Sequence, residues 1–271
     1  MNPVVTLGIT AGTVTSLAMG NHHTCALIVN GEVKCWGQNT RGNLGDGTIE
    51  NRNVPDRVSG LSAATFVGAG HTHSCAAIRV GGVLCWGAGD FGQLGNGASE
   101  DSSTPVPVSG IDGAVIQLDA GGENGHTCAL LEDRSLMCCG ANMYGQLSDG
   151  TPRGTNIPVN VTSRIPGVIK SMKFGFYHTC VLLESTEVLC WGKNTDAQLG
   201  DGTTTDRHEP TYIPVETNGV PAIGMTGVDY GEGYNCVTGW GGGAVLGKQC
   251  AWVAGRRHHQ CAEFQLRGWP S

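Results

Sequence analysis

A pair of cysteines ten residues apart recurs four times along this 271-residue chain. The first cysteines of successive pairs are 50, 53 and 52 residues apart, and a fifth such cysteine, Cys236, follows after 56 more. The pairs are Cys25 and Cys35, Cys75 and Cys85, Cys128 and Cys138, and Cys180 and Cys190. A period of about 50 residues predicts a repeat architecture in which neighbouring units bury each other's faces.

The repeat occupies almost the whole chain and predicts one propeller domain. The array covers residues 1–246, with units around 20–69, 70–122, 123–174 and 175–230 and a partial unit over 231–246, before an irregular tail over 247–271. Each complete unit contains about four short strand-like segments and no helical periodicity, which predicts an all-β β-propeller of four-stranded blades. About five units either close as a ring or leave it incomplete.

Two further patterns agree with stacked blades. Residues 25–29 are apolar on both faces of the expected strand, with Cys25, Leu27 and Val29 on one face and Ala26 and Ile28 on the other. Burial on both faces is expected when each sheet lies between two neighbours. A Pro-Val pair closes the later units, and proline favours an edge strand. These pairs are Pro105-Val106, Pro158-Val159 and Pro214-Val215.

Composition narrows the function classes. Charged residues make up 14% of the chain, with 16 Lys+Arg against 23 Asp+Glu and a net charge of −7. Such a chain has no basic field for nucleic acid. No apolar run reaches the roughly 18 residues of a transmembrane helix, so no membrane-spanning segment is expected. The 44 glycines suit turns that need positive φ.

The repeated motifs resemble those of the regulator of chromosome condensation repeat family. In the first unit the matching residues are Gly20, Thr24, Ala26, Leu27, Val33, Trp36, Gly37, Asn39, Gly42, Leu44, Gly45 and Gly47. This resemblance implies a β-propeller, and the cysteine pairs make the chain more similar to secreted bacterial members than to nuclear ones. It implies function weakly, because propellers host many activities. Known members include an exchange factor for a small GTPase and an inhibitor of β-lactamases.

The cysteine spacing predicts four hairpin disulfides. Each pair centres on a predicted turn, at residues 30, 80, 133 and 185, so its members face each other across an antiparallel hairpin. Bridges of this kind indicate an oxidising compartment, extracellular or in the cell envelope. Reduced thiols in a cytosolic repeat are one alternative, and zinc is another, although zinc cysteines are usually two to four residues apart.

Histidines and aspartates also recur in register. His23, His73, His126 and His178 could suggest a metal site or a general base. One per blade, they would lie far apart, which favours a hydrogen bond that holds a strand. Asp46, Asp149 and Asp201 lie in Gly-rich turns, where one carboxylate each is too few for a calcium site. We therefore expect turn formers, no metal and no cofactor.

The loop after each Cys-Trp-Gly segment varies from unit to unit. A constant scaffold with variable loops is typical of a binding face, although ordinary sequence drift would produce the same variation. The candidate partner-binding residues are Asn39, Arg41, Asp90, Phe91, Asn142, Tyr144, Asn194 and Asp196. No catalytic motif accompanies them. The leading prediction is a non-catalytic scaffold for an unidentified protein partner outside a bacterial cell; the alternatives are a guanine-nucleotide exchange factor for a small GTPase and an inhibitor of a secreted enzyme such as a β-lactamase.

The repeat pattern breaks after Gly239. A shifted reading frame is our hypothesis for the break, to be tested on the gene sequence: codons can be chosen for Val245 to His259 that encode the missing Cys-Trp to Gly-Asp-Gly-Thr half when read one base later. The missing cysteine would then fall about ten residues after Cys236. At the other end, the first residues are read as the end of a preceding unit, so we expect a fragment of a larger secreted propeller.

Overall fold

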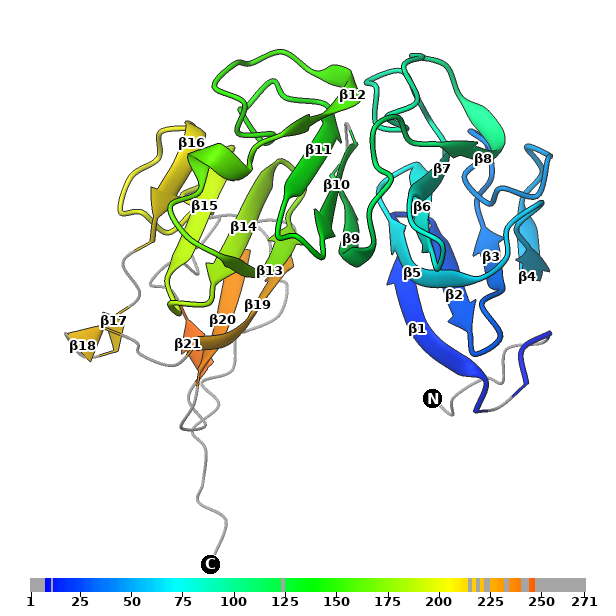
Figure 1. Cartoon of the computed structure of the whole chain (residues 1–271), viewed down its shortest axis with the longest axis horizontal. Coiled ribbons are helices and arrows are strands. Elements are labelled where there is room, and N and C mark those ends of the chain that lie inside the picture. The colour runs from blue at the N-terminus through cyan, green and yellow to red at the C-terminus, as the bar shows by residue number, and fades with distance from the viewer. Residues whose placement is uncertain are drawn as a thin grey trace, which may run out of the picture.

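The computed structural model contains four four-stranded antiparallel sheets, one for each complete unit of the repeat (Figure 1). The structure describes residues 8–10, 12–122, 125–213, 216–217, 220–221, 225–231, 234–239 and 244–246. The first two sheets consist of β1 (Val14–Met19), β2 (His23–Ile28), β3 (Val33–Gly37) and β4 (Arg52–Arg57), then β5 (Ala64–Ala69), β6 (His73–Ile78), β7 (Val83–Gly87) and β8 (Ser102–Pro107).

Two further sheets repeat this order, and a smaller one follows. They consist of β9 (Val115–Gly121), β10 (His126–Leu131), β11 (Leu136–Gly140) and β12 (Thr155–Asn160), then β13 (Ile169–Phe174), β14 (His178–Leu183), β15 (Val188–Gly192) and β16 (Arg207–Tyr212). The fifth sheet holds β19 (Met225–Gly231), β20 (Tyr234–Gly239) and β21 (Ala244–Leu246), and β17 (Glu216–Thr217) pairs with β18 (Val220–Pro221).

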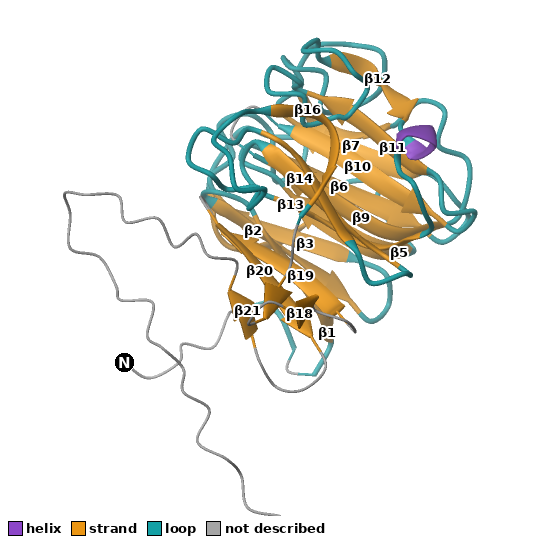
Figure 2. Cartoon of the chain, turned by 90° about the vertical axis from the view of Figure 1, so that its left-hand side faces the viewer, coloured by secondary structure: helices purple, strands orange, loops and turns teal. Residues whose placement is uncertain are grey.

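The sheets follow one another around an arc as the blades of a propeller (Figures 1 and 2). The first strands of successive blades lie next to each other, since β1 contacts β5, β5 contacts β9, β9 contacts β13 and β13 contacts β19. The fourth strand is therefore the outer edge of each complete blade. The predicted all-β propeller is confirmed, and among the described residues the only helix is the single turn Thr162–Arg164, far too short to cross a membrane.

The blades are offset from the sequence units. Each sheet begins with the apolar segment before the unit, so β1 precedes Gly20 and β5 precedes Gly70. The expected proline edges are confirmed in β8 and β12, the outermost strands of their sheets. In the fourth blade the edge strand is β16, earlier than expected; Pro214-Val215 lies outside the described residues.

The core lies between the blades. One apolar cluster joins residues of the first and second blades, such as Leu27 and Trp86, and two similar clusters join the second to the third and the third to the fourth. Residues 25–28 are buried as predicted. Val29 is 67% exposed, so its expected burial is wrong: it follows the last residue of β2 and lies in the turn.

All four predicted disulfides are present, each between directly opposed residues of the second and third strands of a blade. Their Cα–Cα distances are 4.1, 4.0, 4.1 and 4.1 Å in chain order. The bridges join Cys25 to Cys35, Cys75 to Cys85, Cys128 to Cys138, and Cys180 to Cys190. Both sulfurs of each predicted pair are used in its bridge, which leaves none of the eight as a reduced thiol or a zinc ligand.

The fifth sheet keeps the register of the bridged hairpins. Its pairing places Leu246 opposite Cys236, at the position where the other blades carry a second cysteine. The tail over 247–271 lies outside the described residues, and with it residues 247–259 of the segment in which a shifted frame is inferred.

Candidate functional site on the loop face

Antiparallel pairing brings two sets of loops to one end of every blade. The turn between the first and second strands lies near the propeller axis, and the longer loop between the third and fourth strands lies farther from that axis. We call this surface the loop face. Its inner turns are residues 20–22, 70–72, 122–125 (of which 123 and 124 are not described) and 175–177, and its outer loops are residues 38–51, 88–101, 141–154 and 193–206.

A buried asparagine holds three of the four outer loops. Asn39 Nδ2 donates to Asp46 Oδ1 at 3.2 Å and to the carbonyl of Thr48 at 3.1 Å, while its Oδ1 accepts from the Leu44 N–H at 2.9 Å. Asn142 and Asn194 make the equivalent bonds, and all three side chains are buried. Their prediction as partner-binding residues is wrong, because their polar atoms are used inside the loop.

The second outer loop reaches the same shape without asparagine. Gly89 occupies that position, and a Cβ there would lie 2.0 Å from the carbonyl oxygen of Glu100. Backbone therefore fills the space that a side chain occupies in the other loops. The Gly89 N–H donates instead to Asp101 Oδ1 at 3.0 Å, as the Asn39 N–H donates to Asn51 Oδ1 at 2.8 Å.

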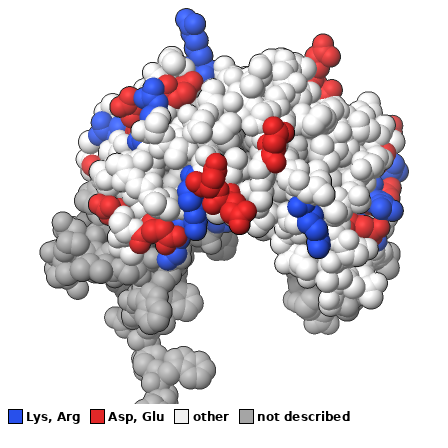
Figure 3. All heavy atoms as spheres, viewed as in Figure 1, with Lys and Arg blue, Asp and Glu red and all other residues white. Residues whose placement is uncertain are grey.

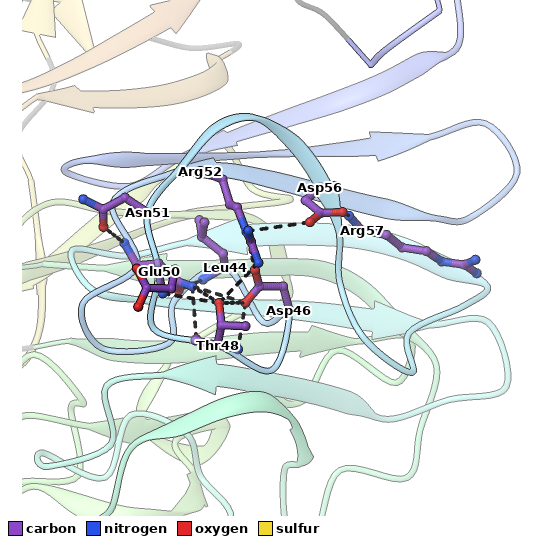
Figure 4. Close-up of polar contacts among 9 residues, drawn as sticks. Leu44, Asp46, Thr48, Glu50, Asn51, Arg52, Asp56 and Arg57 are labelled. Carbon is purple, nitrogen blue, oxygen red and sulfur yellow. Dashed lines mark hydrogen bonds and ion pairs between the residues drawn. The ribbon is translucent and has the colours of Figure 1, made fainter.

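The aspartates that follow are turn formers, as predicted (Figure 4). Asp46 Oδ1 accepts from the N–H and the hydroxyl of Thr48 at 2.9 and 2.7 Å, and Arg52 Nε donates to Asp46 Oδ2 at 2.7 Å. Burial alone would raise the pKa of Asp46, but these hydrogen bonds outweigh it and hold the pKa below its usual value. The described residues contain no cluster of three or more metal-ligating side chains.

The other candidate residues point outward from this rigid skeleton. Arg41 in the first loop binds Asp101 through two nitrogens and lies 3.3 Å from Asp90 in the second loop, which joins neighbouring blades. Phe91 is 42% exposed in the second loop. Tyr144 is half-buried, and Asp196 is an exposed partner of Lys193 at 3.2 Å.

Aromatic side chains form a continuous track between the third and fourth blades. Tyr144 meets Tyr177 edge to face, with ring centroids 5.2 Å apart, and Phe176 follows at 6.5 Å from Tyr177. Lys193 Nζ lies 6.0 and 5.5 Å from the two tyrosine centroids. Sequence reasoning missed Phe176 and Tyr177; an alignment of the inner turns would show them in place of the polar residues Asn21-His22 of the first unit.

The track ends at a cavity on the propeller axis. The cavity has a volume of about 200 Å³ and is lined by the inner turns of all four complete blades. Small residues and glycines form most of its wall, and Met19 and Phe176 contribute the large apolar side chains. Asn21 Nδ2 lies 3.4 Å from His71 Nε2 at its edge, while the buried Nδ1 of His71 has no hydrogen-bond partner.

The four recurring histidines are buried, and none belongs to a cluster of three or more metal-ligating side chains within the described residues. Thr127 donates to the carbonyl of Gln93 at 2.8 Å, so its oxygen must accept the N–H of His73 Nε2 at 2.9 Å. His23 with Ser74, and His126 with Thr179, repeat this bridge between blades. The predicted strand-holding role is confirmed for these three histidines.

Tryptophan completes the same contact in two blades. Trp86 Nε1 donates to the carbonyl of Asn43 at 3.0 Å, and Trp191 Nε1 donates to that of Gln146 at 2.8 Å. The third blade has Cys139 at this position, with its Sγ 3.8 Å from the carbonyl oxygen of Gln93. Burial raises the pKa of the Cys139 thiol to about 12, so it is an inert core residue.

Sequence comparison matches the repeat. The profile described as Regulator of chromosome condensation (RCC1) repeat matches residues 30–77, 80–130 and 186–237, and a second profile of that description matches 14–43, 115–146 and 169–198. The Ultraviolet-B receptor UVR8 of Arabidopsis thaliana is 30% identical over 202 residues, 74% of this chain and 46% of the receptor. The probable E3 ubiquitin-protein ligase HERC4 of Homo sapiens is 31% identical over 229 residues, 83% of this chain and 21% of the ligase.

Solved structures show the same fold. Prp20p of Saccharomyces cerevisiae superposes with a TM-score of 0.72 at 21% identity, over 85% of this chain and 56% of Prp20p; that structure was described with its binding properties to Gsp1p and histones. Human WBSCR16 superposes with a TM-score of 0.74 at 21% identity, over 85% of this chain and 58% of that one. The chain therefore spans less than two thirds of each of these relatives.

Proposed function

Because this chain belongs to the family of regulator of chromosome condensation (RCC1) repeat proteins, we propose that it is a non-catalytic protein-binding scaffold. The loop face is its contact surface. Relatives of this fold bind proteins, as Prp20p does.

One observation carries the proposal: the outer loops keep their buried skeleton and change their outward residues. Their leucines and glutamine or asparagine side chains are buried at the same register in every complete blade. The outward pair before them differs in each loop, and it is Thr40-Arg41, Asp90-Phe91, Met143-Tyr144 or Thr195-Asp196. A rigid frame that presents different side chains is suited to recognition of a surface.

The chemistry of the described side chains supports a non-catalytic role. His23, His73 and His126 are buried in bridges between blades and have depressed pKa values, so they cannot serve an open site as general bases. The thiol of Cys139 is buried and keeps its proton. Most carboxylates of the loop face accept hydrogen bonds within turns or form ion pairs, and the others are isolated from one another.

The disulfides support a place outside the cell or in the cell envelope, because such bonds persist in oxidising compartments. Similarity to secreted bacterial members of the family stays a prediction.

Position-specific photo-crosslinking tests the scaffold. A photoreactive phenylalanine analogue replaces Phe91 or Met143 on the loop face and, as the control, Val80, which is 88% exposed in the turn at the opposite end of its blade. The full chain is expressed in the source cell with its disulfides intact. We expect the same discrete adduct from both loop-face positions and not from position 80. Equal labelling from all three positions would contradict the proposal.

A further inference from the structure

The central cavity and the aromatic track form one continuous apolar path. Phe176 belongs to both, since it lines the cavity and precedes Tyr177 and Tyr144 along the track. The path contains no carboxylate, and Lys193 at its outer end is paired with Asp196. A cavity of about 200 Å³ accommodates one large apolar side chain, and the track offers ring surface to the residues beside it.

The remainder of the loop face is acidic. Its outer loops, together with the two arginines that pair with their aspartates (Arg52 and Arg207), hold five basic and nine acidic residues, a net charge of −4. Figure 3 shows acidic and basic side chains in small groups spread over the face that it views. The excess gathers on the first two blades, where Glu50 and Glu100 are exposed and one arginine, Arg41, faces both Asp90 and Asp101.

We propose that the loop face binds an extended cationic peptide segment of its partner, with one large apolar side chain in the central cavity and basic side chains over the loops of the first two blades. This inference rests on the proposed scaffold function. Charge complementarity favours a cationic occupant. The loop carboxylates attract a segment that carries lysine or arginine, and they repel an acidic segment.

The same charges disfavour a nucleic acid. A phosphate backbone gains affinity from Lys and Arg contacts that release counterions, and the loops of the first two blades with Arg52 hold two arginines against five carboxylates. An oligonucleotide is therefore the negative arm of the test rather than a second occupant.

The probe is a set of fluorescent twelve-residue peptides, and their binding to the oxidised 271-residue chain is measured by fluorescence anisotropy. The reference peptide has a central phenylalanine in a glycine-serine backbone with two lysines on each side. One relative replaces each lysine by glutamate, another replaces the phenylalanine by serine, and a single-stranded oligonucleotide completes the set. We expect the reference to bind at least tenfold more tightly than either relative in 50 mM salt. Its advantage over the glutamate peptide should shrink at 500 mM salt.

Matched charge reversals locate the site. The variant Glu50→Lys/Glu100→Lys changes two exposed loop-face carboxylates, and the control Glu132→Lys/Glu187→Lys makes the same change in net charge in turns at the opposite ends of the blades. We expect the first variant to weaken the reference peptide about tenfold and the control to leave it within twofold. Equal effects would overturn the proposal.

A cavity-filling variant tests the anchor. Ala69 lines the cavity at the strand register where the first blade carries Met19, so Ala69→Met uses a side chain that this position of the fold already accepts. We expect it to weaken the reference peptide and to leave the phenylalanine-to-serine peptide unchanged, with an unaltered circular dichroism spectrum. Unchanged binding of the reference peptide, or tighter binding of the glutamate peptide or the oligonucleotide, would overturn the inference.

The crosslinking experiment separates this inference from the proposed function. If crosslinks still arise at positions 91 and 143, the scaffold function stands while this inference fails.

Discussion

His73 and Thr127, which belong to neighbouring blades, are joined by a buried hydrogen bond of 2.9 Å whose direction is fixed. The hydroxyl proton of Thr127 goes to the carbonyl of Gln93, so the histidine carries its proton on Nε2 and leaves Nδ1 bare. The recurring Gly-x-x-His spacing has a steric basis too: a Cβ at Gly70 would lie 2.4 Å from the ring of His73.

Replacing Thr127 by valine should destabilise the protein. Thr127→Val keeps the shape but removes a donor and an acceptor, so both the His73 N–H and the Gln93 carbonyl lose a partner in the core. Each buried orphan costs about 1–3 kcal/mol, so we expect the free energy of unfolding to fall by about 2–4 kcal/mol. Urea denaturation measures it. The exposed Thr40→Val variant serves as the control, and a loss no larger than the control's would disprove the bridge.

Acid should destabilise the propeller through the same histidines. Burial, with a smaller effect of neighbouring histidines, lowers the pKa of His23 to about 4 and that of His73 and His126 to about 3, from 6.5. Below pH 6.5 the unfolded chain binds protons that the folded chain excludes. Stability is therefore full above pH 6.5 and falls by about 1.4 kcal/mol per pH unit for each histidine down to its folded pKa.

Unfolding curves between pH 7.5 and 4.5 check this. In His73→Gln the side-chain amide still donates to Thr127 but does not titrate. The slope of the unfolding free energy against pH should therefore decrease by the contribution of one proton, about 1.4 kcal/mol per pH unit. An unchanged slope would exclude His73 as a source of the acid sensitivity.

Replacing Ser148 by glycine should stabilise the protein. The other three loops have glycine at this position, whereas Ser148 is fully buried at φ 61° and its hydroxyl has no hydrogen-bond partner. Glycine removes both the left-handed strain and the orphan hydroxyl. Thermal unfolding should show a gain of about 1–3 kcal/mol in Ser148→Gly. Gly45→Ser, the reverse change in the first loop, should lose stability, and a gain there would contradict the explanation.

Replacing Leu246 by cysteine should create a fifth disulfide. Leu246 is paired with Cys236 in the register that the four bridged pairs share, ten residues apart. Peptide mapping without reductant should find Cys236 linked to the new residue in Leu246→Cys. The control Val245→Cys, whose residue faces Val237, should remain a free thiol. Free thiols at both positions 236 and 246 would show that the fifth sheet departs from the register of the others.

The sequence predicted whatever depends on local periodicity. The hairpin disulfides could be predicted because the two cysteines of each pair lie at equal distances from a turn. The four-stranded blade could be predicted from the order of the strand-like segments in each unit. It did not reveal which loop polar groups face inward: Asn39 is as polar as Arg41, and only the fold shows that one is buried. A signal was present, because Asn39, Asn142 and Asn194 recur each time with an aspartate seven residues later, which indicates a fixed internal bond. The bridges between blades join residues about 50 apart, beyond what the sequence of one unit reveals.

Every disulfide in the described part of the chain links a cysteine to its neighbour within the same sheet, and none connects two blades. A chain that enters an oxidising compartment from its N-terminus therefore meets each correct partner within ten residues, before the cysteines of the next blade emerge. Pairing in order of emergence reaches the native set without reshuffling. The third blade is the exception, because Cys138 and Cys139 become available to Cys128 together. Neighbouring residues of a strand point to opposite faces of the sheet, so the forming hairpin places only Cys138 on the same face as Cys128.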